Sequence, residues 1–275
     1  LWRLRALAAL ELALVLGGGA AAGVLLTRRR RQTAAPRIGD AVVPPPWPFG
    51  RGVVVLVRGG AAGALVAVAL FVAYQFIDHP VDELLAVPMT YLPFVPVVLL
   101  AARHLAAPAG LTLAGALGLR VPAGRWRQAL LVAVLLCAAG ILGEWLLVLL
   151  GEWRGVDSHW TEWFDRDLVW GTPLVTAMAI LGAVVVAPVM EEIVFRGLVF
   201  GTLRRRLPWP AAALASATLF ALAHGYGALG FAAVLWSGAV WAYAYERTGS
   251  LWPGILAHAA NNAAATLTVI WLLRL

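Results

Sequence analysis

Residues 171–203 of the 275-residue chain read GTPLVTAMAILGAVVVAPVMEEIVFRGLVFGTL. Residues 171–190 contain no charged side chain, and an apolar run of about 18 or more residues is long enough to cross a bilayer as a helix. Two glutamates follow at once, although an ionisable group in the hydrocarbon costs roughly 2.5–3.5 kcal/mol to insert. The stretch therefore predicts a membrane-spanning helix that carries a functional charged cluster.

The whole chain has the composition of a membrane protein. Apolar residues make up 62% of the sequence and charged residues 13%, against about 25% charged residues in soluble domains. This composition excludes a soluble globular fold and predicts one integral membrane domain, residues 1–275, with an all-α, polytopic helical bundle. The eight expected spans lie near residues 6–26, 59–77, 84–102, 128–150, 171–190, 209–224, 228–246 and 251–273.

The basic residues, which are all Arg, predict the orientation of the chain. Alternating spans place most of the 21 on the side of Arg28–Arg31. The exceptions are Arg3, Arg5, Arg154, Arg166 and Arg274. Because basic residues concentrate in cytoplasmic loops, we expect both termini outside a bacterial plasma membrane, with the lipid bilayer as partner and no nucleic-acid binding.

Three segments call for separate interpretation. Residues 32–52 are rich in Pro and Gly and predict a linker on the cytoplasmic membrane surface. Residues 151–170 combine five acidic side chains with four tryptophans, which indicates an outer loop with an interfacial aromatic belt. Near the N-terminus, Arg3 and Arg5 precede an apolar stretch, so a signal peptide is the alternative to a first span.

The charged cluster after residue 190 contains two carboxylates that differ in their expected ion pairing. Glu192 and Arg196 are four residues apart in the favourable Glu-before-Arg order, so they can pair on one helix face. Glu191 lies about 100° round the helix and is not neutralised by that Arg in the same way. We expect one carboxylate to be paired and its neighbour to stay available.

Three further polar side chains follow on two later spans. His224 ends the predicted span 209–224, while His258 and Asn262 are four residues apart on the last span. At about 1.5 Å per residue, these groups and Glu191 lie roughly 14–24 Å from the cytoplasmic ends of their helices. Single polar groups often only join helices, and we expect that for Glu11 and Glu144, but several at one depth indicate a site.

These residues form three motifs with a known combination. EEIVFRG at 191–197, FALAH at 220–224 and HAANN at 258–262 have the patterns EExxxR, FxxxH and HxxxN. In this order they resemble the CAAX prenyl protease and bacteriocin-processing family of intramembrane endopeptidases. The resemblance covers residues 171–265 as a catalytic core, whereas residues 1–170 form N-terminal spans and a linker without a family-specific signal.

The resemblance implies hydrolysis of peptide bonds in a membrane-associated protein or peptide, at a site open toward the cytoplasmic side. The implied catalytic residues are Glu191, His224, His258 and Asn262. The first two would activate a water molecule, and the last two would stabilise the oxyanion. The implied supporting residues are Glu192, Arg196 and Phe220.

The sequence leaves two forms of the implied reaction, one that uses a metal ion and one that does not. One Glu and two His could hold a divalent ion such as zinc with an open position, which is the alternative to catalysis without a cofactor. We favour the metal-independent form, because there is no HExxH motif and consecutive glutamates point in different directions. The single cysteine, Cys137, excludes a Cys-rich zinc site and an intramolecular disulfide.

Other functions remain as alternatives. Serine and aspartyl mechanisms are disfavoured, because the sequence has no GxSG-like nucleophile and its aspartates fall in predicted loops. A non-proteolytic bacteriocin-immunity or scaffold protein could retain the same core. A transporter with a proton relay through Glu191 and His224 is less favoured, because the chain lacks inverted-repeat halves.

Overall fold

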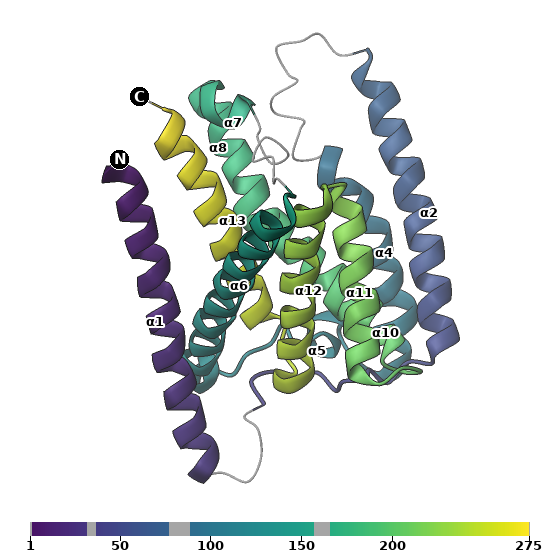
Figure 1. Cartoon of the computed structure of the whole chain (residues 1–275). Helices are drawn as coiled ribbons and strands as arrows, with labels where there is room; N and C mark the ends of the chain where they lie inside the picture. Colours follow the sequence, from purple (N-terminus) through teal and green to yellow (C-terminus); the bar gives the residue numbers. More distant parts are fainter. Residues whose placement is uncertain (1, 32–36, 77–88, 157–165, 275) are drawn as a thin grey trace.

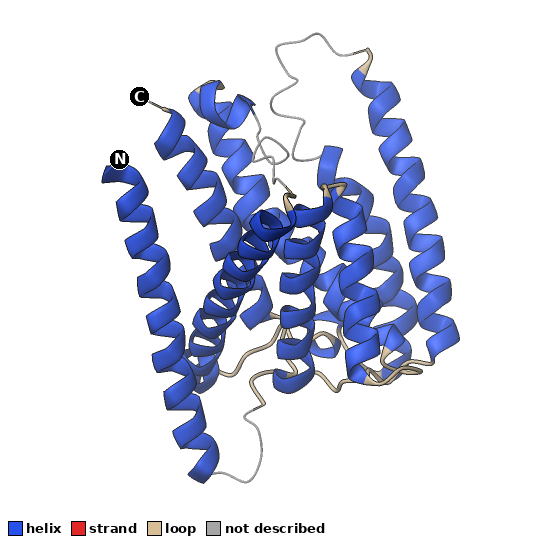
Figure 2. Cartoon of the chain, viewed as in Figure 1, coloured by secondary structure: helices blue, strands red, loops and turns tan. Residues whose placement is uncertain are grey.

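The computed structural model describes residues 2–31, 37–76, 89–156 and 166–274. In these ranges the chain forms helices and loops without a strand, which confirms the all-α polytopic bundle (Figure 2). The uninterrupted helices are α1 (Trp2–Arg31), α2 (Phe49–Tyr74), α6 (Trp126–Arg154), α11 (Trp209–His224), α12 (Ala228–Thr248) and α13 (Trp252–Leu273). Three short helices are α5 (Leu113–Ala116), η5 (Ala123–Arg125) and α7 (Arg166–Trp170).

Two membrane-length segments change helix type along their course. The segment Met89–Ala109 contains the 3-10 helix η2 (Leu92–Phe94), α4 (Val95–Ala101), the π-helix η3 (Ala102–Ala106) and the 3-10 helix η4 (Ala107–Ala109). The segment Pro173–Leu203 contains α8 (Pro173–Leu181), the π-helix η7 (Gly182–Val186), α9 (Ala187–Glu191), the π-helix η8 (Glu192–Phe200) and α10 (Gly201–Leu203). π-Helical turns are rare and are frequent at functional sites. In the second segment they flank the two glutamates, because η7 lies before them and η8 begins at Glu192.

In the described ranges, seven helical segments are long and apolar enough to cross a membrane, and the protein is an integral membrane protein. The expected span at 209–224 is α11, a 16-residue apolar helix that is shorter than the rest. At 1.5 Å per residue it is about 24 Å long, less than the roughly 30 Å of a hydrocarbon core. It starts with Pro at its second position and stops at Gly225, whose φ of 68° ends the helix.

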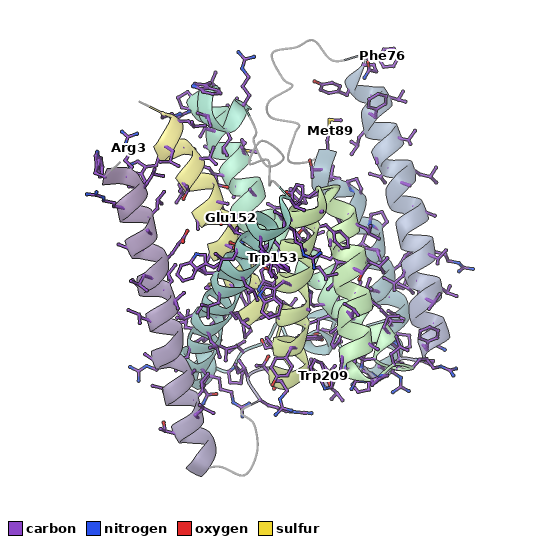
Figure 3. All side chains as sticks on the ribbon, in the orientation of Figure 1. Arg3, Phe76, Met89, Glu152, Trp153 and Trp209 are labelled. Carbon is purple, nitrogen blue, oxygen red and sulfur yellow. The ribbon has the colours of Figure 1, made fainter. Side chains whose placement is uncertain are left out.

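The helices run alternately up and down, so the two chain ends lie at the same end of the bundle (Figure 1). Arg3 lies at the upper end with the termini, and Trp209 lies at the lower end (Figure 3). The ends also touch, because Arg3 donates a hydrogen bond of 2.8 Å to the Trp271 carbonyl and the Trp2 and Trp271 rings are 5.4 Å apart. This alternation agrees with the expected even number of crossings.

The described part of the predicted surface linker is instead packed into the lower end of the bundle. Ile38, Ala41 and Trp47 are buried, and the Ile38 N–H donates a 2.8 Å hydrogen bond to the Thr248 carbonyl. That carbonyl lies at the end of α12, where the helix leaves it without an internal donor. Residues 37–48 are therefore part of the core, because they supply both apolar side chains and backbone donors.

The expected outer loop lies for the most part outside the described residues. Asp157, Trp160, Glu162, Trp163 and Asp165 all fall in the gap 157–165. The described ends of the segment are the last turn of α6 and the short helix α7. The aromatic belt thus stays a prediction.

Candidate active site

A broken helix carries the first motif into the bundle. In η7 the Ala187 N–H donates to the Gly182 carbonyl, five residues back, as in a π-turn. The Ala183 carbonyl would need the N–H of residue 188, but Pro188 has none. The side-chain amide of Asn262 on α13 donates to this carbonyl at 2.8 Å. Asn262 thereby joins the last helix to the turn directly before the glutamates.

The two adjacent glutamates have different surroundings. Glu192 Oε1 lies 2.9 Å from Arg196 Nη1, and both side chains are 1% exposed, whereas the Glu191 side chain is 17% exposed. His258 lies between them, with Nδ1 at 3.3 Å from Glu192 Oε1 and Nε2 at 3.7 Å from Glu191 Oε2. Glu192 is thus a charge-compensated, water-excluded group, and Glu191 is the carboxylate within reach of a small molecule.

The partners of each histidine indicate where its proton resides. Glu192 Oε1 is paired with Arg196 and accepts the Nδ1–H of His258. In the neutral ring Nε2 is then the acceptor, and it faces Glu191. At 3.7 Å from Nε2, Glu191 Oε2 is beyond hydrogen-bond distance and makes no hydrogen bond with the described residues. His224 Nδ1 likewise donates to the Phe220 carbonyl at 2.8 Å, which leaves its Nε2 as an acceptor.

Aromatic side chains enclose the charged cluster. The Arg196 guanidinium lies 4.0 Å from the Phe220 ring centroid and 5.0 Å from that of Trp241. Cation–π contacts of this kind strengthen when water is excluded. Phe220 also has ring contacts with both histidines, at 4.6 Å to His224 and 5.9 Å to His258. Phe220 therefore connects the second and third motifs.

Two glycines make room for the buried ion pair. A Cβ on Gly254 of α13 would lie 2.9 Å from Glu192 Oε2, and one on Gly238 of α12 would lie 3.0 Å from Arg196 Nη2. Neither polar group can retreat easily, because Glu192 is held by Arg196 and His258. The helices α12 and α13 can approach the cluster closely only with glycine at these positions.

The structure brings five of the predicted residues into one cluster and places the other two at its edge. Glu191, Glu192, Arg196, Phe220 and His258 touch one another directly or through one partner. His224 joins them through Phe220, and Asn262 through the turn at Ala183. Within the described ranges, no hydrogen bond or ion pair links either of these two to a glutamate.

The side chains do not fit a zinc centre as they are arranged. Among the described residues, no group of three or more His, Cys, Asp or Glu side chains is placed to hold a metal ion. Both ring nitrogens of His258 face carboxylates, and the two carboxylates approach different nitrogens. A zinc ion requires three or four ligand atoms about 2.0–2.3 Å from one point.

Two residues of the site fall outside the three motifs. Trp241 is 5% exposed, stacks on His258 and covers Arg196. Ser216 on α11 donates a 2.7 Å hydrogen bond to the Phe195 carbonyl in the π-helix η8. Sequence reasoning missed both. Trp241 lies on a helix that carries no motif, whereas Ser216 is four residues before Phe220 on α11, a spacing that could have singled it out.

An apolar groove of about 360 Å³ lies between α2, η2, α4 and η8. Gly59, Gly60 and Gly63 of α2 form one wall, and Val97 of α4 and Val194 of η8 belong to the others. Val194 is two residues beyond Glu192 on the same π-helix. The groove therefore borders η8, which begins at Glu192, whereas Glu191 is the last residue of α9.

Comparisons with known proteins match the part of the chain that holds this cluster. Residues 173–264 match the family model described as type II CAAX prenyl endopeptidase Rce1-like. Over 103 residues the chain is 31% identical to a Bacillus subtilis (strain 168) protein named "Putative membrane peptidase YdiL", and the alignment covers 35% of this chain and 37% of that protein. The chain thus spans little more than a third of this curated relative.

No solved structure matches the chain. The matched residues 173–264 contain all three motifs and the buried cluster that they form. The resemblance of the three motifs is confirmed over residues 173–264, a third of the chain, which are similar to the type II CAAX prenyl endopeptidase Rce1-like family.

Proposed function

We propose that the protein is an intramembrane endopeptidase that hydrolyses peptide bonds of a membrane-associated protein or peptide. The observation that carries the proposal is the buried cluster of Glu191, Glu192, Arg196 and His258 inside membrane-spanning segments. Ionisable groups are rare in such segments, and where they occur they mark functional sites. The match of the same residues to a peptidase family supports hydrolysis as that function.

In the proposed mechanism Glu191 acts as the general base. Its carboxylate takes a proton from a water molecule whose oxygen attacks the peptide carbonyl carbon. The C–N bond then breaks, and the leaving amine takes the proton from Glu191. His224, with Nε2 as acceptor, assists in orienting the water. General acid–base catalysis of this kind contributes about 10²- to 10⁴-fold to a rate.

The oxyanion of the tetrahedral intermediate requires donors. When Nε2 of His258 is protonated it becomes a donor, and Asn262 has a second amide N–H beside the one that binds Ala183. Each fixed donor of this kind is typically worth about 3–4 kcal/mol of transition-state stabilisation. Glu192 and Arg196 do not react in this proposal, since they hold His258 in place.

The proposed substrate approaches from the membrane. The apolar groove beside η8 suits a membrane-associated peptide, because its walls expose apolar atoms along the π-helix that begins at Glu192. The Arg distribution supports an orientation with both termini outside a bacterial plasma membrane, and we propose that the site opens toward the cytoplasmic side.

We expect the reaction to be independent of a metal ion. Exhaustive chelation of the purified protein should leave the rate of cleavage unchanged, because Glu191 and His224 supply the base without a Lewis acid. The measurement compares untreated, chelated and zinc-reloaded protein together with its metal content. Complete loss of activity, restored by one equivalent of a metal ion, would contradict metal independence and leave the peptidase function standing.

The test of the function compares membrane-protein fragments in cells that carry the wild type or the Glu191→Gln variant. We expect at least one membrane protein whose cleavage products are present with the wild type and absent with the variant. The same comparison with His224→Ala should give the same missing products. If cells with either variant contain the wild-type fragments and show whatever phenotype the wild-type protein confers on them, a non-proteolytic immunity or scaffold role replaces the proposal.

A further inference from the structure

We propose that Trp241 is a positioning residue that holds the His258 ring in the plane in which it contacts both glutamates. Trp241 lies on α12, between the second and third motifs in sequence. Its effect on rate rests on the proposed peptidase function, whereas its effect on the His258 ring is a property of the fold alone.

The two rings stack with their centroids 4.4 Å apart and an interplanar angle of 24°. An imidazole turns about its Cβ–Cγ bond, and turning moves both ring nitrogens away from their partners. The indole face lies in the path of that rotation, because a turned ring would collide with a surface at van der Waals distance. The Phe220 ring, at 84° to the imidazole and 5.9 Å away, makes an edge contact to the same ring.

Trp241 also contacts Arg196, whose partner Glu192 binds Nδ1 of His258. The Arg196 guanidinium lies 5.0 Å from the indole centroid, and neither of its terminal nitrogens makes a hydrogen bond with the described residues. The aromatic faces and the Glu192 carboxylate are therefore its counterparts. One indole thus restrains both Arg196 and His258, which flank Glu192.

A merely space-filling role would depend on the volume of residue 241 and not on its flat face. Two substitutions separate these properties. Trp241→Phe keeps an aromatic face, and Trp241→Leu removes it with a side chain whose volume is close to that of Phe. Tyr243→Leu is the matched control, because Tyr243 is an exposed aromatic residue on the same helix. Helical content and thermal unfolding in detergent establish that each variant is folded.

The first readout is the rate at which diethyl pyrocarbonate modifies His258 in the purified protein, measured by mass spectrometry against the exposed His104 of the same molecule. In Trp241→Leu we expect this ratio to rise about 3- to 10-fold, because the free energy of one lost aromatic pair corresponds to a factor of this size. Trp241→Phe and Tyr243→Leu should stay close to the wild type. A ratio in Trp241→Leu equal to that of the wild type overturns the proposal, whether or not the protein cleaves anything.

The second readout is turnover of the membrane protein whose cleavage depends on Glu191. We expect kcat to fall about 10- to 100-fold in Trp241→Leu with KM unchanged, because a small displacement of a reacting group costs rate and not binding. Trp241→Phe should recover most of the loss. Equal losses in Phe and Leu variants would reduce Trp241 to packing. If Trp241→Leu does not fold, Trp241→Met takes its place, because the unbranched and flexible Met side chain adapts to an irregular gap without an aromatic face.

Failure of the peptidase function is recognised separately. In that case the wild type and Glu191→Gln give identical membrane fragments, while the modification of His258 still decides the role of Trp241.

Discussion

Glu191→Gln is expected to lower the rate of peptide-bond cleavage by about 10³-fold or more. The amide keeps the size of the side chain but cannot take a proton from water, and loss of a general base costs about 10²- to 10⁴-fold. The folded state should be unaffected, because Glu191 Oε2 makes no hydrogen bond with the described residues. The measurement is the single-turnover rate of the purified variant on the membrane protein identified by the cellular comparison.

Glu144→Gln supplies the matched control for this result. Glu144 is also a carboxylate inside a membrane-spanning helix, but it lies on α6, outside the cluster. The change removes the same charge from the bilayer and should leave cleavage within about 2-fold of the wild type, because Glu144 has no contact with the cluster. Equal losses in both variants would mean that the effect belongs to membrane insertion and not to the base.

Arg196→Met is expected to lower the free energy of unfolding by about 3–5 kcal/mol. The substitution leaves Glu192 as a buried carboxylate without its guanidinium, and breaking a buried ion pair from one side costs about that much. It also removes the contacts over Phe220 and Trp241. Unfolding in detergent, followed by tryptophan fluorescence or by resistance to proteolysis, measures the change.

The pair between Arg204 and Glu246 provides the comparison. It is bidentate, with two hydrogen bonds of 2.8 Å, but its side chains are 15–16% exposed. We expect Arg204→Met to cost about 1 kcal/mol or less, because water screens an accessible pair.

A double variant tests whether the loss in Arg196→Met arises from the stranded charge. Glu192→Gln combined with Arg196→Met should be more stable than the sum of the single losses predicts, by about 0.5–3 kcal/mol. Strict additivity of the two changes would show that Glu192 and Arg196 are not energetically coupled.

The helices were predictable because hydrocarbon imposes a simple rule on the backbone. Each spanning segment must satisfy its own N–H and C=O groups, so apolar runs of sufficient length become helices. The pairing of Glu192 with Arg196 was predictable for the same local reason, since residues four apart share a face. The predicted span 209–224 coincides with α11, because Gly225 ends that helix.

Other features depend on residues that are distant in sequence. Residues 37–48 were expected on the membrane surface. Instead, their N–H groups donate to the open carbonyls at the end of α12, and their apolar side chains are buried in the bundle. The Ala183 carbonyl is left open by Pro188, yet nothing near it in sequence says that Asn262 supplies the donor. The stack of Trp241 on His258 likewise joins two helices that meet only in the folded bundle.

The sequence by itself determined an all-α membrane protein, the three motifs and one neutralised glutamate, because periodicity, length and i to i+4 spacing act within a single helix. Only the tertiary structure decided which nitrogen of His258 faces which carboxylate, how Asn262 is engaged and what encloses Arg196. These depend on how helices cross. In a membrane, crossings are set by close packing and by buried polar groups that must find a partner on another helix.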